Sequence, residues 1–358
     1  MKTGVRGHGS GVRTVAAAAA LALVARLVGA QERVTLTVLF TSDVHAHVLP
    51  YDDLRERPAA GSLAQAASIV ARLRAANPRT VVLDGGDAIE GTPLAYYAIA
   101  SSAGTGHDPT IAAMNAIGYD AAVLGNHEFN FGLDVLRRSL AQSAFPWLAA
   151  NAAGRERAGL PVGDEIVIDR GGVRVGVLGL TNPNVPHWDP PSHWAGLEFE
   201  DPVRVAAARV PALRRRADVV IVVAHTGFEE DPDTGAANGT GAENFAARLA
   251  RVPGIDLLLT GHTHRNIAPR ALGTTVVAQP GRWAEFLTRV ELDLARDARV
   301  WKVAGWRGEN LPTAREAPAA AVTAAAAADE ARAALPVGRG NAREVSLFRR
   351  RSLAEEGP

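Results

Sequence analysis

The stretch Ala121-Ala122-Val123-Leu124-Gly125-Asn126-His127-Glu128-Phe129-Asn130 joins a short apolar run to a group of reactive polar residues. The apolar run 121–124 predicts a buried strand, and Gly125 lets the chain turn where a side chain would clash. Asn126 offers a neutral oxygen ligand, and His127 can bind a metal or transfer a proton near neutral pH. A purely structural interpretation is also open, in which Asn126 and Glu128 cap the following helix.

Composition limits the kinds of site that the chain can form. It has 358 residues, 47% of them hydrophobic, so it can bury a large core in one big domain or two modest ones. The formal net charge is zero, which gives no indication of a nucleic-acid polymer or an anionic membrane as partner. There is no cysteine, so any metal must be bound by His, Asp, Glu or Asn.

Residues 1–30 have the pattern of an export signal. Basic residues precede the apolar run 16–24, and small residues at 28–30 suit cleavage before Gln31. The run is too short for a comfortable membrane span. We therefore expect an exported protein, periplasmic or extracellular, with no stable membrane insertion after signal removal. An uncleaved anchor or a disordered leader is the alternative.

From residue 34 onward, segments typical of strands alternate with segments of helical spacing. Gly171-Gly172 between two strand patterns predicts a hairpin. This order predicts an α/β fold with mixed sheets and helices on the outside. The expected strands are 34–40, 80–83, 121–124, 147–149, 166–169, 173–180, 219–223, 255–259, 274–278, 286–294 and 300–305, and the expected helices are 63–73, 110–117, 133–142, 203–216, 243–252 and 319–334.

Several of these strands end in potential metal ligands. In open α/β sheets, ligands bind outside the carboxyl ends of the strands, so such residues can converge on one rim. In Asp-x-His and His-x-His, alternate side chains can face a common point. Each motif alone is often structural, but the ordered set favours a site. Its members are Asp43 and His45, Asp87, Asn126 and His127, His225, and His262 and His264.

This set of side chains suits two divalent ions. The nitrogen and oxygen ligands favour Mn, Zn, Fe or Co over Ca and are also compatible with Mg. Two ions about 3.5–4 Å apart lower the pKa of a shared water and stabilise the attacking and leaving oxygens of an in-line displacement. That chemistry fits phosphate ester hydrolysis.

The ordered series D-x-H, G-D, G-N-H-E, H and G-H-x-H resembles that of the calcineurin-like metallophosphoesterases, over roughly Val34 to Arg296. The resemblance implies a four-layer fold, two mixed β-sheets flanked by helices. It also implies specific ligand roles. One ion would be held by Asp43, His45 and His264, the other by Asn126, His225 and His262, with Asp87 bridging them.

Within that superfamily, the stretches 84–93, 125–132 and 279–283 resemble the exported 5′-nucleotidase / 2′,3′-cyclic-nucleotide 2′-phosphodiesterase (3′-nucleotidase) group. The likeness implies attack by a metal-bridging hydroxide, with Asn126 and His127 at the substrate and His127 as the catalytic imidazole. Members of the 5′-nucleotidase type commonly carry Asp three residues after this His. Asn130 can orient the ring but supplies no charge, so it would raise the imidazole pKa less. Asn at this position resembles the cyclic-phosphodiesterase / 3′-nucleotidase members, which implies 2′,3′-cyclic nucleotides and 3′-nucleotides as substrates, with 5′-nucleotides as a further option.

The expected organisation is a signal peptide at 1–30, a dimetal domain at 31–312 and an Ala-rich linker or tail at 313–358 with little to bury. The nucleotide-binding domain usual in the family would then be absent, through truncation or because the catalytic domain works alone. The expected partner is a small nucleotide or phosphoester, bound by a monomer. Two alternatives stay open, an inactive or truncated exported binding module and a sulfur-ester hydrolase on the same dimetal scaffold.

Other residues near the motifs receive mainly structural interpretations. Glu128 is expected to be a charge at a helix N-terminus rather than a ligand. Trp188 and Trp194 either pack within their Pro-rich loop or stack on a base. The remaining candidates are His107, His187 and His193 as surface residues, Trp283 as part of the cleft and Arg282 as a weak phosphate candidate.

Overall fold

The structure is a computed structural model that describes residues 1, 32–52, 57–100, 106–297 and 300–333. Almost all of the expected signal peptide and the end of the expected tail lie outside the described residues. Among the residues described, we find no helix with both the length and the apolarity needed to cross a bilayer.

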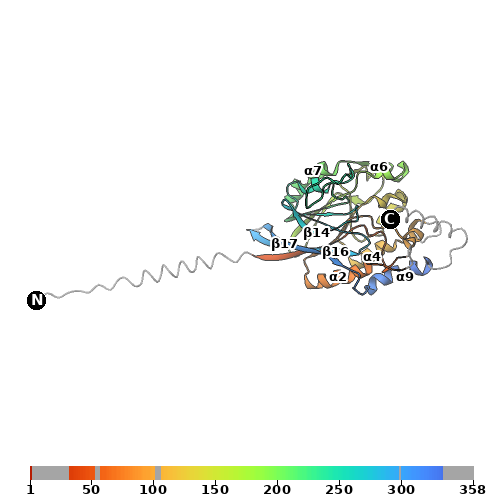
Figure 1. Ribbon diagram of the computed structural model, residues 1–358, viewed down its shortest axis with the longest axis horizontal. Helices are drawn as coiled ribbons and strands as arrows, with labels where there is room; N and C mark the ends of the chain where they lie inside the picture. Colours follow the sequence, from red (N-terminus) through yellow and green to blue (C-terminus); the bar gives the residue numbers. More distant parts are fainter. Residues whose placement is uncertain (2–31, 53–56, 101–105, 298–299, 334–358) are drawn as a thin grey trace.

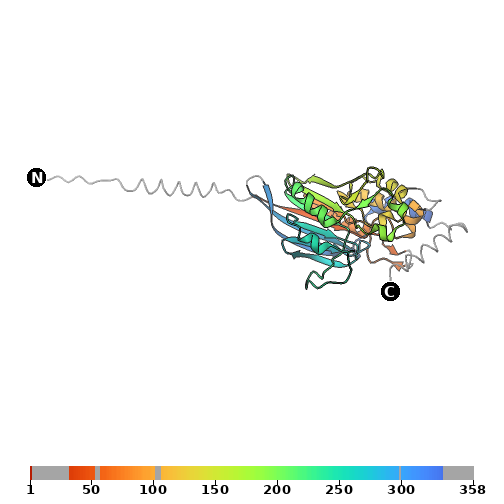
Figure 2. The ribbon, with the colours of Figure 1, turned by 90° about the horizontal axis from the view of Figure 1, so that it is seen from above.

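Two mixed sheets form the centre of the domain (Figure 1). In the first, β1, β4, β5 and β6 run parallel, whereas β16 is antiparallel to both β1 and β17. The long β16–β17 hairpin extends along one side of the domain in Figure 2. The seven strands in spatial order are β17 (Val300–Pro312), β16 (Phe286–Asp297), β1 (Arg33–Thr41), β4 (Thr80–Asp84), β5 (Ala121–Val123), β6 (Trp147–Leu148) and β8 (Val162–Gly163).

The second sheet is also mixed. Strands β10, β12, β13 and β15 are parallel, and the outer strands β9 and β14 are antiparallel to their neighbours. The predicted hairpin at Gly171-Gly172 is confirmed, since it joins β9 to β10. The six strands in order are β14 (Asn266–Leu272), β15 (Thr275–Pro280), β13 (Leu257–Thr260), β12 (Val219–Ala224), β10 (Arg174–Leu180) and β9 (Glu165–Asp169). Short pairs are formed by β2 (Tyr51–Asp52) with β3 (Arg57–Pro58) and by β7 (Ala152–Ala153) with β11 (Glu198–Phe199).

Alternation along the strands explains why the two sheets stack. In β1, Val38 and Phe40 point into the core between the sheets, whereas Leu39 points to the opposite face. In β12, Ile221 faces the same central core and Val222 faces away. Both faces of each sheet are therefore apolar, and each sheet is covered on its outer side by helices.

The helices complete four layers (Figure 1). The first sheet is covered by α2 (Leu63–Ala76), α4 (Pro109–Ile117), α5 (Leu133–Leu140) and α9 (Ala320–Ala333). The second is covered by α7 (Pro202–Arg214) and α8 (Ala246–Ala250). The predicted four-layer fold is confirmed. Short helical segments are α3 (Pro93–Ala95), η1 (Tyr96–Ala100), η2 (His127–Phe129), α6 (Val185–Trp188) and η3 (Pro191–Trp194).

The Ala-rich segment departs from expectation. Val322 and Ala326 of α9 are buried in the core that covers the first sheet. Thr313 is also buried, and its hydroxyl donates to the carbonyl of Ala284 at 2.6 Å. The expectation that this helix has little to bury was therefore wrong, because alanine allows the close approach of α9 to its neighbours. The packed part of the chain continues past residue 312.

Candidate metal centre

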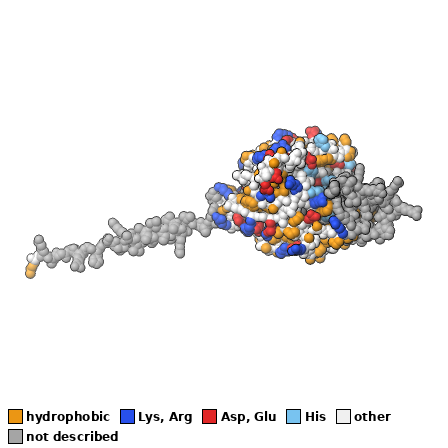
Figure 3. All heavy atoms as spheres, viewed as in Figure 1, with side chains coloured by type: hydrophobic (Ala, Val, Ile, Leu, Met, Phe, Trp, Pro, Cys, Tyr) orange, Lys and Arg blue, Asp and Glu red, His pale blue; other side chains and the backbone are white. Residues whose placement is uncertain are grey.

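Loops at one rim of the two sheets carry the expected ligands. In the first sheet, Asp43 follows β1, Asp87 follows β4 and Asn126 follows β5. In the second sheet, His225 follows β12 and His262 follows β13. Histidine side chains are visible together on the face shown in Figure 3. The structure thus brings the carboxyl ends of strands from both sheets to a common site.

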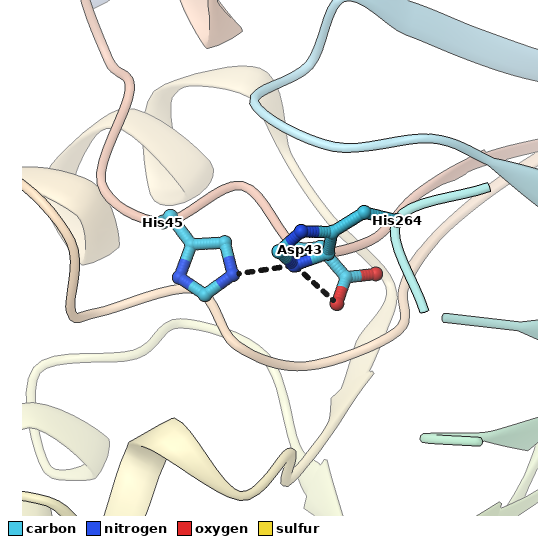
Figure 4. A group of neighbouring side chains, drawn as sticks. All are labelled: Asp43, His45 and His264. Atoms are coloured by element: carbon cyan, nitrogen blue, oxygen red, sulfur yellow. Dashed lines mark hydrogen bonds and ion pairs between the residues drawn. The ribbon is translucent and has the colours of Figure 1, made fainter. Parts of the chain in front are cut away.

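The first cluster consists of Asp43, His45 and His264 (Figure 4). One ligand atom from each lies within 4.8 Å of the others. The Nε2 atoms of His45 and His264 are 3.0 Å apart, and the Nε2 of His264 is 3.6 Å from Oδ1 of Asp43. Nδ1 of His45 donates to the carbonyl of Glu90 at 3.2 Å, which leaves its Nε2 lone pair facing His264.

The second cluster consists of Asp87, His225 and His262, again with ligand atoms within 4.8 Å of one another. Nδ1 of the fully buried His225 donates to the carbonyl of Gly85 at 2.8 Å. Its Nε2 therefore faces Oδ2 of Asp87 at 2.9 Å and Oδ1 of Asn126 at 3.1 Å. Asn126 thus lies at this cluster, as predicted.

These geometries fit a cation in each cluster. Nε2 of His225 converges with one oxygen each from Asp87 and Asn126, and a proton or a metal ion between them would satisfy their lone pairs. Burial lowers the pKa of His264 to about 4, against the opposing charge of Asp43, so its ring is neutral and able to ligate. Nε2 of His262 lies 2.7 Å from Oε1 of Glu243, which leaves Nδ1 for an ion.

Backbone strain is concentrated in the loops of this site. Among the described non-glycine residues, positive φ values occur at Asp43, His45, Asp87, His262 and His264, and otherwise only at neighbours of the site: Ala46, Trp283 and Ala284. Left-handed backbone at such residues costs free energy and is found mainly where function requires a fixed geometry.

The glycines beside the ligands serve two purposes. Gly86 has a φ of 91°, a conformation that favours glycine. Gly125 has no such conformation, but a Cβ there would overlap the carboxylate of Asp87. Gly86 therefore supplies a backbone conformation, whereas Gly125 leaves room for the Asp87 side chain, where a clash was predicted.

Glu128 has a different role from the one predicted. It is completely buried, and its carboxylate accepts hydrogen bonds from the backbone N–H groups of Gly125, Asp87, Ala88 and Ile89 at 2.6–3.4 Å. It therefore joins the Gly125 turn to the loop that carries Asp87. Sequence reasoning missed this because three of the four donors, the N–H groups of residues 87–89, lie about forty residues earlier in the chain.

His127 lies beside both clusters. Its backbone N–H donates to Oδ1 of Asp87 at 2.8 Å, and its ring packs edge-on to His45 at 5.1 Å between centroids. Its Nδ1 lies 2.6 Å from Oδ1 of Asn130, so the expected pairing with Asn130 is present in the structure. A carboxylate also lies near this ring, because Oε2 of Glu90 is 3.4 Å from Nδ1.

The negative charge around His127 is larger than the presence of Asn rather than Asp at position 130 suggested. Burial opposes protonation, but the carboxylates of Asp87 and Glu90, with the Asn130 hydrogen bond, raise the pKa of His127 to about 9. Cations bound beside Asp87 would oppose this effect by offsetting its charge. Glu90 lies within the stretch 84–93 that carries the resemblance, but nothing in its spacing indicated that its carboxylate would reach His127.

Two aromatic residues and one arginine lie at the edges of the site. The ring of Trp188 is 43% exposed and lies 5.4 Å from that of His262. Trp283 stacks on His47 at 4.5 Å, and the guanidinium of Arg282 lies 4.0 Å above the Trp283 ring. Nη1 of Arg282 is 3.4 Å from Nδ1 of His264.

The loop histidines and Trp194 differ in their exposure and contacts. His107 and His187 are exposed, as predicted. His193 is half-buried, and its Nδ1 lies 3.2 Å from Oδ1 of Asp189, a partner that the sequence did not indicate. Trp194 packs against the core, and its indole N–H donates to the carbonyl of Asp189 at 3.2 Å, which confirms loop packing for this residue.

Comparison with known proteins identifies a family for this chain and agrees with the fold. Residues 36–266 match the family described as calcineurin-like phosphoesterase. The fold and the paired Asp/His clusters define the class as a phosphoesterase with candidate metal sites. The chain belongs to the calcineurin-like phosphoesterase family, and the predicted resemblance is confirmed.

Named relatives are nucleotide phosphoesterases. The chain is 33% identical to the trifunctional nucleotide phosphoesterase protein YfkN of Bacillus subtilis, over 78% of this chain and 21% of that protein. It is 32% identical to a 2′,3′-cyclic-nucleotide 2′-phosphodiesterase/3′-nucleotidase of Yersinia enterocolitica, over 78% of this chain and 46% of that protein. The chain therefore spans less than half the length of these relatives.

A solved structure shows the same fold. The crystal structure of the calcineurin-like phosphoesterase YfkN from Bacillus subtilis superposes with a TM-score of 0.73 and 31% identity. The match covers 84% of this chain and 98% of the solved chain.

Proposed function

We propose that this protein is an exported, metal-dependent phosphoester hydrolase that acts on nucleotides. The observation that carries the proposal is the convergence of two Asp/His clusters on one rim, with His127 beside both of them. When bound, two divalent ions would lower the pKa of water in the site and stabilise negative charge on phosphoryl oxygens. The donor set admits Mn, Zn, Co, Fe or Mg.

Each residue of the site has a proposed role in metal binding or in catalysis. Asp43, His45 and His264 would hold one ion, and Asn126, His225 and His262 the other, with Asp87 shared between them. His127 would stabilise the phosphoryl transition state or protonate the leaving oxygen through its ring. Arg282 adds a cation next to the first cluster, with its Nη1 3.4 Å from Nδ1 of His264.

The substrate class is inferred from two observations. The relatives matched over most of this chain include proteins named for 2′,3′-cyclic nucleotides and 3′-nucleotides. Asn130 is paired with His127, as the resemblance implies for that group. We therefore favour these substrates over 5′-nucleotides. We also propose that the protein acts as a monomer, with a catalytic domain that spans residues 31–312 and the packed helix that follows. No observation favours the sulfur-ester or non-catalytic alternatives.

An activity panel tests this proposal. The purified protein is assayed with Mn, Zn, Mg and Co on 2′,3′-cAMP, 3′-AMP, 5′-AMP and bis-p-nitrophenyl phosphate. Wild type is compared with Asp87→Ala and with Asp134→Ala, whose side chain is 83% exposed and belongs to neither cluster. Metal-dependent turnover that is lost only in Asp87→Ala is expected. No turnover of any substrate by wild type, or full turnover by Asp87→Ala, would contradict it.

A further inference from the structure

A buried carboxylate, Asp189, lies behind the pair formed by His127 and Asn130. It directly follows α6 in the Pro-rich loop, and only 8% of its surface is exposed. Its backbone N–H donates to the carbonyl of Val185 at 3.0 Å, and its carbonyl accepts from the indole of Trp194. The backbone N–H and the carbonyl of Asp189 are thus both fixed by hydrogen bonds.

The Asp189 side chain faces the amide of Asn130. Nδ2 of Asn130 lies 3.2 Å from each carboxylate oxygen of Asp189, and Oδ1 of Asp189 lies 3.2 Å from Nδ1 of His193. A carboxylate only accepts hydrogen bonds, so the NH2 group of the amide must point toward it. The reverse orientation would place the amide oxygen against two carboxylate oxygens.

The orientation of this amide determines a proton position in the site. With its nitrogen toward Asp189, Asn130 presents Oδ1 to Nδ1 of His127 at 2.6 Å. An amide oxygen can only accept, so Nδ1 of His127 must carry the proton in both the neutral and the charged ring. The carboxylate of Glu90, 3.4 Å from the same nitrogen, favours the same tautomer.

We propose that Asp189 is a positioning residue, which fixes the Asn130 amide and through it the Nδ1–H tautomer of His127. The negative charge that Asn130 lacks is thus provided one hydrogen bond further away. The role of the tautomer in turnover rests on the proposed phosphoester hydrolysis, whereas the tautomer itself does not depend on it.

Exchanging the two side chains tests the pair directly. Asn130→Asp alone sets two carboxylates against each other, and Asp189→Asn alone removes the charge that selects one amide orientation. The double variant Asn130→Asp/Asp189→Asn restores a donor facing an acceptor, with the direction reversed. We expect each single variant to lower kcat by about tenfold or more with a smaller change in KM, and the double variant to recover most of it. Asp134→Asn is the matched control.

A second readout does not need turnover. The ring nitrogens of His127 are followed by ¹⁵N NMR in wild type, where Nδ1 is expected to be protonated. Asp189→Asn should give a mixture of tautomers, and the double variant should restore one form. Metal content and melting temperature are measured in each protein, so that a general folding defect is recognised.

The outcomes separate the two proposals. The positioning role would be overturned if the kcat of the double variant were no higher than that of the worse single variant. It would also be overturned if Asp189→Asn left both kcat and the ¹⁵N chemical shifts of the His127 ring unchanged. If Asp189→Asn does not fold, the comparison of Asn130→Asp with the double variant decides. If wild type shows no phosphoester turnover, the proposed function fails, and the NMR result alone then supports or overturns the tautomer assignment.

Discussion

The Nε2 atoms of His45 and His264 lie 3.0 Å apart, although 219 residues separate the two histidines in sequence. Such an approach of two ring nitrogens needs a proton or a cation between them, and burial disfavours the protonated form of His264. The fold therefore holds these rings in an arrangement that a bound metal would stabilise.

Metal addition should raise the melting temperature. A cation at a hundred times its dissociation constant stabilises the native state by about 2.7 kcal/mol. Scanning fluorimetry of EDTA-treated protein, titrated with Mn, Zn, Co, Fe and Mg, measures the shift. His264→Ala should reduce it, whereas His187→Ala, at an exposed position, should not. A wild-type melting temperature unmoved by every metal would count against both clusters.

Glu128→Gln should destabilise the protein by roughly 2–3 kcal/mol, because it leaves buried N–H groups without an acceptor. The amide has one oxygen, and its NH2 group would face backbone donors that now bond to Glu128. Urea unfolding measures the change, with the exposed Glu156→Gln as control. Equal stability of the two variants would show that Glu128 does not hold the Asp87 loop.

Strand ends were predictable from sequence, but the contacts behind them were not. Asp43, Asp87 and His225 each follow an apolar strand, and position relative to a strand end is a local property of the chain. The stacking of the two sheets was implied only by the resemblance. Strands β1 and β12 are apolar on both faces, so their sequences do not show which face packs against the other sheet and which against helices.

The missed residues share a physical feature. Glu90 contacts His127, Glu243 contacts His262, and Asp189 contacts Asn130, in each case through hydrogen bonds or ion pairs between separate segments of the chain. No periodicity or spacing records such a pairing, because each partner is chosen by three-dimensional proximity. Glu128 was adjacent to the motif and still misinterpreted, since its burial depends on the loop after β4.

The Arg174–Asp218 pair gives a pH-dependent contribution to stability away from the site. Burial alone would raise the pKa of Asp218, but hydrogen bonds from the side chain and backbone of Arg174, at 2.9–3.1 Å, hold it below its ordinary value. A depressed folded-state pKa contributes stability above the unfolded value, near 3.9 for Asp, and this is lost as the pH falls.

Asp218→Asn should therefore cost about 1–2 kcal/mol at pH 7, a value reduced by the exposure of Arg174. The difference from wild type should shrink below about pH 4. Urea unfolding between pH 3 and 7 measures it, with Asp134→Asn as the control. A constant difference over that range would mean that the charge of Asp218 is not responsible.

Arg282→Gln should raise KM for phosphoesters by about tenfold and leave metal content unchanged, because it removes a cation that stacks on Trp283 beside the first cluster. Arg282→Lys should recover part of the effect, since it keeps the charge but not the planar fork. Steady-state kinetics and metal analysis measure both, with the exposed Arg215→Gln as control. Loss of metal without a change in KM would instead assign Arg282 to the support of His264.

Trp188→Ala tests whether the exposed indole beside His262 contacts the base of a nucleotide. Stacking of a base on an aromatic side chain contributes about 1–3 kcal/mol, which corresponds to a rise in KM of roughly 5- to 150-fold. The rise should occur for 3′-AMP and not for glycerol 2-phosphate, which has no ring, and Trp188→Phe should recover part of it. Equal effects on both substrates would show that Trp188 supports the metal loop and does not bind the base.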